Sequence, residues 1–113
     1  METANTLSVE KLARMHGISG IQLSPAVSAY YIHNALAIIR MLEKEVLPVA
    51  QVNAYSLDSE GPHFQGSLCC NFHEGESWSD YTKRSYKESV DFIKMMESDG
   101  TNRFGYVFTT YQP

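Results

Sequence analysis

The residues with the most chemical potential lie close together in the middle of the chain, in the stretch HFQGSLCCNFH from His63 to His73. Histidine and cysteine are the ligands that zinc sites use most, so this stretch has the residue types of a metal site. It also alternates apolar and polar residues, which is typical of a half-buried β-strand. At about 3.3 Å per residue, a straight strand would hold Cys69 and His73 about 13 Å apart, too far to share one metal ion. The spacing therefore predicts a strand, and no metal or other cofactor is expected.

The two cysteines are neighbours in the sequence, so strand geometry points them to opposite faces and they cannot pair without strain. A chain without a disulfide is typical of a reducing compartment, and we expect a cytoplasmic protein. A catalytic thiol needs a basic neighbour, and Cys69 lies in an acidic segment. A histidine from elsewhere, such as His16 or His33, could still approach it. A small enzyme or ligand-binding domain that uses Cys69 or a histidine therefore stays open as one alternative.

The alternation in this strand predicts one buried row and one polar row. The buried row is expected to consist of Phe64, Gly66, Leu68, Cys70 and Phe72. The polar row is expected to consist of Gln65, Ser67, Cys69 and Asn71. Tyr55 shares a face of the preceding strand with Gln51 and Asn53, so the two strands together predict an open, polar face that carries an aromatic side chain.

Hydrophobic periodicity and helix-capping residues predict the other elements. Helices are expected at residues 8–16, 24–47 and 79–98, and strands at 49–57, 63–73 and 103–111. Ser8 and Ser24 are expected to cap the first two helices, with Pro25 in the first turn of the second, and Ser77 or Ser79 to cap the third, which should end at Gly100. The longest helix should bury one face made by Tyr31, Ile32, Ala35, Leu36, Ile38, Ile39, Leu42 and Val46.

This order, ααββαβ, predicts an α+β fold. A three-stranded, mostly antiparallel sheet with helices packed on one face would bury the apolar rows. The chain of 113 residues should form a single globular domain over 1–113, with residues 1–6 flexible. The exposed edges of such a sheet could pair two copies into a homodimer.

The charges of this chain are unevenly distributed. Between residues 45 and 82 every charged residue is acidic, and all nine lysines and arginines lie outside that window. The six acidic residues are Glu45, Asp58, Glu60, Glu74, Glu76 and Asp80. Such a distribution disfavours nucleic acid and suits a partner with a basic surface. We expect no membrane contact, because no uncharged run reaches the length of a membrane span.

The first predicted helix and the residues after it resemble the start of a DNA-binding helix-turn-helix. Ala13, Gly17 and Ile18 have the spacing that is familiar from that family. The resemblance implies a recognition helix directly after Ser19, although Pro25 would fall inside it. A transcriptional regulator that uses a degenerate helix-turn-helix at residues 8–23 is therefore the first alternative, ahead of an enzyme or ligand-binding domain.

The last predicted strand also resembles a nucleic-acid-binding element. Phe104-Gly105-Tyr106-Val107 looks like the core of the aromatic octamer of RNA recognition motifs, in which aromatic rings stack on bases. The helix and strand that follow that octamer in the family have no room here, because only six residues remain after Val107. An aromatic strand that packs under helices is the interpretation we prefer.

Taken together, these patterns favour a small intracellular protein-binding module that inhibits or regulates a larger protein without catalysis. Small acidic chains of this kind are typical of immunity proteins and of inhibitors encoded by phages. Seven tyrosines support the idea, since tyrosine is enriched in interfaces. The predicted contact residues are Tyr55, Asp58, Glu60, Gln65, Ser67, Cys69, Asn71, Glu74 and Glu76.

Overall fold

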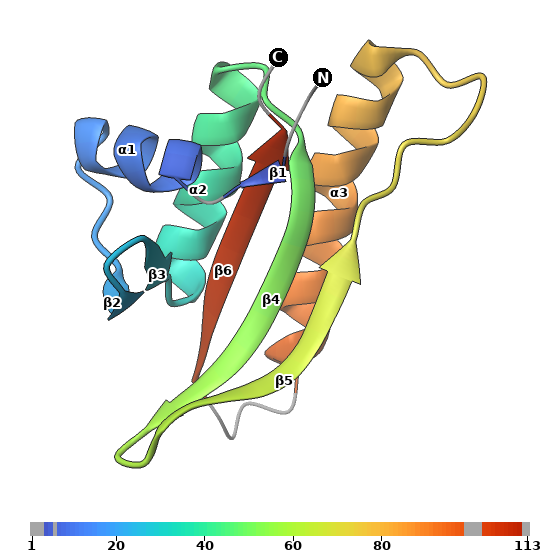
Figure 1. The fold of residues 1–113 in the computed structure, drawn as a ribbon. Coiled ribbons are helices and arrows are strands. Elements are labelled where there is room, and N and C mark those ends of the chain that lie inside the picture. The colour runs from blue at the N-terminus through green and yellow to red at the C-terminus, as the bar shows by residue number, and fades with distance from the viewer. Residues whose placement is uncertain (1–3, 6, 99–102, 112–113) are drawn as a thin grey trace.

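The computed structural model describes residues 4–5, 7–98 and 103–111 and has an α+β fold, as the sequence predicts. The main sheet is antiparallel, in the order β1-β6-β4-β5. Its three long strands are β4 (Val49–Asp58), β5 (Gly61–Cys69) and β6 (Phe104–Tyr111). Helices α2 (Ile32–Lys44) and α3 (Trp78–Met96) pack against one face of this sheet (Figure 1).

The core lies between the sheet and these two helices. Its members are mainly apolar or aromatic and include Ile38 and Leu42 on α2, Phe92 and Ile93 on α3, and Val52, Tyr106 and Phe108 on the sheet. Helix α1 (Leu7–Met15) adds Val9 and Ala13 to the same core beside α2. The alternation in β6 predicts this packing, since every second residue of the strand faces the helices.

Two predicted helix starts are wrong. Helix α1 begins at Leu7, so Ser8 lies in its first turn and does not precede the helix. The second helix begins at Ile32, because residues 21–29 instead form a hairpin of β2 (Ile21–Ser24) and β3 (Val27–Ala29). Pro25 lies in the turn of that hairpin. A Ser-Pro pair suits a turn as well as a helix start, and here the turn forms.

The hairpin of β2 and β3 also overturns the helix-turn-helix interpretation. In the position where a recognition helix would lie, the chain forms β2 and has no helix until α2. Gly17 does end α1 as predicted, with the positive φ of 71° that glycine adopts readily. The element resembling a DNA-binding motif is thus a capped helix followed by a hairpin.

The third helix starts and ends close to its prediction. The Ser77 hydroxyl accepts a hydrogen bond from the backbone N–H of Asp80 at 3.0 Å, which makes Ser77 the N-cap. Gly100, its predicted end, lies outside the described residues. Ala4 and Asn5, in the segment predicted to be flexible, form β1 against the end of β6. Residues 1–3 and 6 lie outside the described residues.

The predicted buried face of the long helix is largely right. Ala35, Ile38, Ile39 and Leu42 are buried, whereas Val46 is exposed. Val46 lies after the helix, where the chain turns away with a positive φ of 56°. Within the described residues, none of the helices combines the length and the apolar character that a membrane crossing requires.

Candidate functional site

The face of the main sheet opposite α2 and α3 carries the polar row predicted for β4 and β5. The register places Asn53 opposite Ser67, and Gln51 opposite Cys69. Gln51 donates a side-chain hydrogen bond to Asn53 at 3.1 Å, so these amides hold each other in place. Ser67 and Cys69 are exposed, and their β4 neighbours are half-buried. We call the surface made by Gln51, Asn53, Tyr55, Ser67 and Cys69 the open face.

A β-bulge changes the side-chain pattern in the first half of β5. The register shifts between Ala54, which pairs with Gly66, and Tyr55, which pairs with Phe64, so Gln65 is the extra residue. Phe64 therefore joins Tyr55 on the open face, where the two rings meet edge to face with centroids 5.9 Å apart. Phe64 is 60% exposed, so its predicted burial is wrong.

The same bulge moves Gln65 away from its predicted row. Its amide donates a hydrogen bond to the Ser56 hydroxyl at 3.1 Å, and by alternation Ser56 lies on the helix side of β4. Three other members of the predicted buried row lie on the helix side, as expected. Cys70 is fully buried, Leu68 packs against the core, and Gly66 lies under Met96 of α3.

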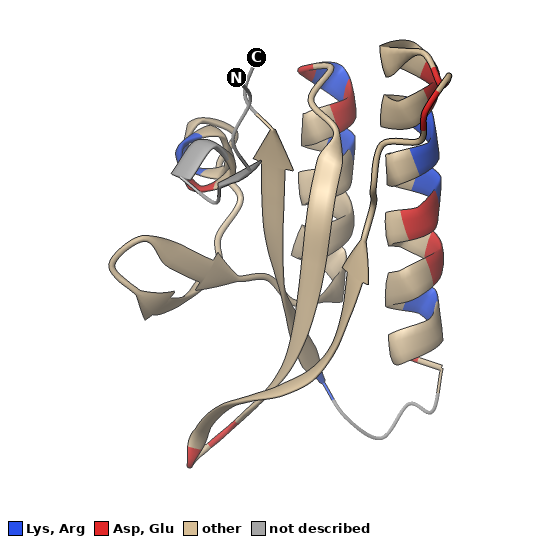
Figure 2. Ribbon diagram, turned by 45° about the vertical axis from the view of Figure 1, so that its right-hand side comes forward, with Lys and Arg blue, Asp and Glu red and all other residues tan. Residues whose placement is uncertain are grey.

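Asp58 and Glu60 lie together at the tip of the hairpin formed by β4 and β5. The Asp58 carboxylate accepts the backbone N–H of Glu60 at 2.9 Å, which shapes the tight turn. His63 lies 3.3 Å from the same carboxylate, and both side chains are about half exposed. Figure 2 shows this acidic tip at the far end of the hairpin, with no lysine or arginine along the two strands leading to it. The tip is thus an acidic projection at the end of the main sheet.

The other predicted acidic residues lie at the opposite end of β5, in the loop that leads to α3. Glu76 is engaged within the protein, since it accepts hydrogen bonds from the Arg84 guanidinium at 2.7 and 2.8 Å. These hydrogen bonds lower the pKa of Glu76 to about 2. Arg84 also donates to the backbone carbonyl of Asn71 at 2.7 Å and to Glu88 at 3.0 Å. Among the predicted residues of this loop, Asn71 and Glu74 are exposed and Glu76 mainly fastens the loop.

Phe72 was predicted to continue the buried row, but β5 ends at Cys69 and Phe72 is 48% exposed. It lies in a cluster of aromatic rings with Trp78 and Tyr81 of α3, 5.3 Å from Tyr81 by ring centroids. With Tyr111 these residues line a hollow of about 390 Å³. The sequence contains one signal for this aromatic cluster, namely aromatic residues on both sides of an acidic loop. It contains no signal that Tyr111 lies beside them.

The tyrosines as a group are less available for binding than their number suggests. Tyr30, Tyr81, Tyr86 and Tyr106 are all buried. Three of their hydroxyls donate hydrogen bonds inside the protein. Tyr81 donates to the carbonyl of Cys70 at 2.5 Å, and Tyr86 donates to the carbonyl of Leu47 at 2.8 Å. Tyr106 donates to the Glu97 carboxylate at 2.8 Å. Phe104 and Tyr106 of the strand that resembles an RNA-binding element are buried, so they cannot stack on bases.

The cysteines and histidines do not converge. Both cysteines are free, and within the described residues no three histidine, cysteine or acidic side chains are placed to hold a metal ion. Burial raises the pKa of the Cys70 thiol to about 11, which keeps it protonated and unreactive. Cys69 is exposed on the open face, opposite Gln51.

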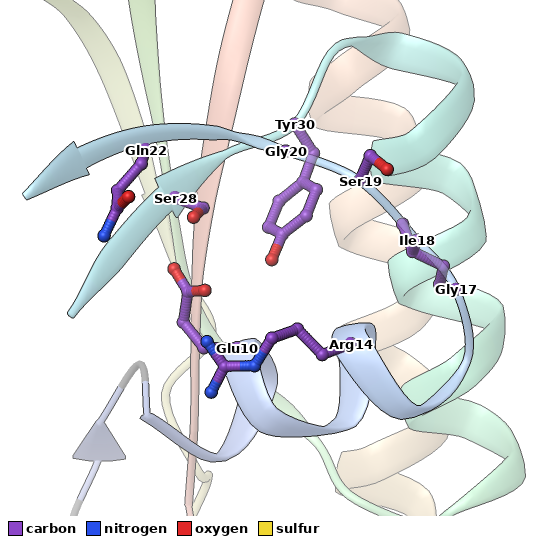
Figure 3. A pocket seen from close by; sticks show the side chains of 9 residues that line it. All are labelled: Glu10, Arg14, Gly17, Ile18, Ser19, Gly20, Gln22, Ser28 and Tyr30. Atoms are coloured by element: carbon purple, nitrogen blue, oxygen red, sulfur yellow. The ribbon is translucent and has the colours of Figure 1, made fainter. Parts of the chain in front are cut away.

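A separate polar pocket of about 380 Å³ lies between α1 and the hairpin of β2 and β3. Figure 3 shows the Tyr30 hydroxyl pointing toward α1, where Glu10 and Arg14 reach into the same space. Burial, with the nearby Glu10 charge, raises the pKa of Tyr30 to about 12. One Glu10 oxygen is buried and has no hydrogen-bond donor among the described residues. The lining contains neither cysteine nor histidine, so this pocket does not support the alternative that uses Cys69 or a histidine.

Comparison with known proteins identifies a family for this chain. No curated protein and no solved structure matches the chain. The family model of immunity protein 40 matches residues 19–110, which run from before β2 to the next-to-last residue of β6 and include all of the predicted contact residues. Because the match covers most of the chain, this protein belongs to the immunity protein 40 family and is an inhibitor of a toxin partner, the function class that its sequence favours.

Proposed function

We propose that the chain neutralises its toxin by non-covalent binding through the open face of β4 and β5 and the acidic tip of their hairpin. One observation carries the proposal. Helices α2 and α3 cover only one side of the main sheet, so polar groups of two long neighbouring strands point away from the core on the other. A sheet face that combines polar side chains able to form hydrogen bonds with an exposed aromatic pair suits the centre of a protein interface.

The chemistry of this surface supports a basic toxin. Tyr55 and Phe64 provide a rigid aromatic contact, and Asn53 and Ser67 can each donate and accept hydrogen bonds. Asp58 and Glu60 would steer a basic toxin surface toward the hairpin, because complementary charges raise the association rate. Binding of this kind requires no reacting group on the immunity protein.

The place of action that we propose is the cytoplasm. Both cysteines are free thiols, and the exposed Cys69 would persist as a thiol in a reducing compartment. An inhibitor in that compartment would meet the toxin where the toxin reaches its target.

The test begins with identification of the toxin by pull-down from a lysate of the source organism, followed by its production together with this chain in a host cell. We expect the wild-type chain to restore growth. Asn53→Arg places a cation at the centre of the open face and should weaken toxin binding by about tenfold or more. Glu45→Arg is the matched control, because it introduces an arginine at the exposed end of α2 and should leave affinity unchanged.

Thermal unfolding of both variants would show whether they stay folded. Equal toxin affinity of wild-type and a folded Asn53→Arg variant would contradict the proposed surface. Failure of the wild-type chain to bind or neutralise any toxin would contradict the proposed function itself.

A further inference from the structure

Within the part of the chain that the structure describes, the outer edge of β5 has no partner strand. On the opposite edge, β6 pairs with β1 near its end, and Tyr106 exchanges two backbone hydrogen bonds of 2.9 Å with Tyr30 near its start. β5 pairs with β4 on one side only, and no other strand among the described residues lies along its outer side. An edge of this kind presents a row of backbone donors and acceptors to the surroundings.

The hydrogen-bond pattern shows which backbone groups point outward. The N–H of Cys70 donates to the carbonyl of Ala50 at 2.9 Å, and antiparallel pairs alternate between bonded and non-bonded. Gly66 and Leu68 therefore bond to β4, whereas the N–H and C=O of Ser67 and Cys69 point away from it. These four unpaired groups form a short template for another strand.

The second half of this edge lacks the usual protection against pairing. Natural edge strands are commonly blunted by charged side chains, proline or bulges. In β5 the proline and the bulge, at Pro62 and Gln65, lie in the first half of the strand. Residues 61–69 contain no lysine, arginine, aspartate or glutamate, so nothing at Ser67 or Cys69 repels an incoming strand.

The charges at the two ends of β5 favour a different protein over a second copy of this chain. Antiparallel pairing of two copies about Leu68 would bring the acidic tip of each copy toward the loop with Glu74 in the other. Like charges would then meet at both ends of the new pair, which opposes a dimer. A partner strand with an uncharged middle and basic residues at its ends would meet acidic groups at both positions.

We propose that β5 binds an extended strand of the toxin by strand addition, with backbone hydrogen bonds to Ser67 and Cys69. This inference rests on the proposed function, and it specifies how the partner is held. The added strand would extend the main sheet beside the open face, so that the toxin contacts both surfaces together.

Ser67 allows a matched test, because its side chain and its N–H face different directions. Ser67→Pro removes the outward N–H and leaves the hydrogen bonds to β4 intact, a substitution that edge strands tolerate. Ser67→Ala removes only the hydroxyl on the open face. We expect the proline variant to bind the pulled-down toxin about tenfold or more weakly, whereas the alanine variant should lose less than about threefold. Cys69→Pro repeats the test at the second outward N–H.

Equal losses for Ser67→Ala and Ser67→Pro would overturn strand addition and leave the open face as the contact, as would full affinity in both proline variants. Light scattering tests whether a second copy pairs with β5 instead. A wild-type chain that is dimeric, together with a Ser67→Pro variant that is monomeric, would overturn the choice of a toxin strand as the occupant. If neither proline variant folds, hydrogen exchange at the Ser67 and Cys69 amides of the wild-type complex is measured instead. Slower exchange in the complex would support strand addition, and unchanged exchange would overturn it. A chain that binds no toxin at all would instead fail the proposed function.

Discussion

One edge of the main sheet, along β6, is covered by β1 and by Tyr30, while the opposite edge, along β5, has β4 as its single partner among the described strands. The covered edge is built from residues far apart in sequence that pack closely. The free edge is a strand without lysine, arginine, aspartate or glutamate, and the backbone groups of Ser67 and Cys69 face outward from it. The same chain closes one edge and leaves the other available, which fits our proposal that β5 serves binding while β6 serves stability.

The largest effect should come from crowding the covered edge. A Cβ atom at Gly105 of β6 would lie 2.6 Å from a Leu57 methyl group and 2.9 Å from the Ala29 methyl group. We therefore expect Gly105→Ala to lower the free energy of unfolding by about 1–3 kcal/mol, measured by urea denaturation. At the free edge, a Cβ at Gly66 would meet Met96 at an ordinary 3.7 Å.

Gly66→Ala is thus the control for Gly105→Ala, and it should be neutral or stabilise by about 0.5 kcal/mol. Equal losses at both positions would mean that β5 is packed as tightly as β6, which would remove the distinction between the edges.

A smaller effect is expected where β5 leaves the sheet. The buried Tyr81 hydroxyl donates to the Cys70 carbonyl directly after β5, so Tyr81→Phe should cost about 1 kcal/mol of unfolding free energy. The Tyr55 hydroxyl makes no hydrogen bond within the described residues, and Tyr55→Phe should change stability by less than about 0.5 kcal/mol. A cost for Tyr55→Phe as large as that for Tyr81→Phe would show that the open face contributes to folding.

The smallest effect concerns the loop at the end of β5 and depends on pH. The pKa of Glu76 is lowered to about 2 in the folded protein by Arg84, from an unfolded value of about 4.3. Its stabilising contribution is therefore full above about pH 5 and is lost as the pH falls toward 2. The melting temperature of Glu76→Gln should be below that of wild-type at pH 7, and the two should converge near pH 2. A gap that stays constant over this range would contradict the ion pair as its cause.

The sequence was sufficient for elements with local signals. Ser77 marks the start of α3, alternation identifies the long strands, and the apolar stripe of α2 identifies the helix-covered face. Residues 21–29 were missed because Ser24-Pro25 suits both a helix start and a turn. The hairpin at residues 21–29 is followed directly by Tyr30, which pairs with Tyr106. These two residues are far apart in the chain, so no local sequence pattern predicts their contact.

The candidate site could be predicted only where local alternation determines it. Ser67 and Cys69 are on the exposed row where alternation placed them, but the bulge at Gln65 reverses the strand before them and exposes Phe64. A bulge depends on how β4 and β5 pair, and one sequence stretch does not determine that. Glu76 looked free because Arg84, its partner, lies two turns into the next helix. The binding role of the predicted residues stays a prediction.

Backbone amide hydrogen exchange, measured for the free chain and for its complex with the toxin, tests the account most directly. In the free chain, Gly66 and Leu68 should exchange slowly and Ser67 and Cys69 quickly, because only the first two bond to β4. Toxin binding should then strongly slow exchange at Ser67 and Cys69. Unchanged exchange at both amides, with new protection confined to α2 and α3, would contradict the assignment of β5 and the open face as the toxin-binding surface.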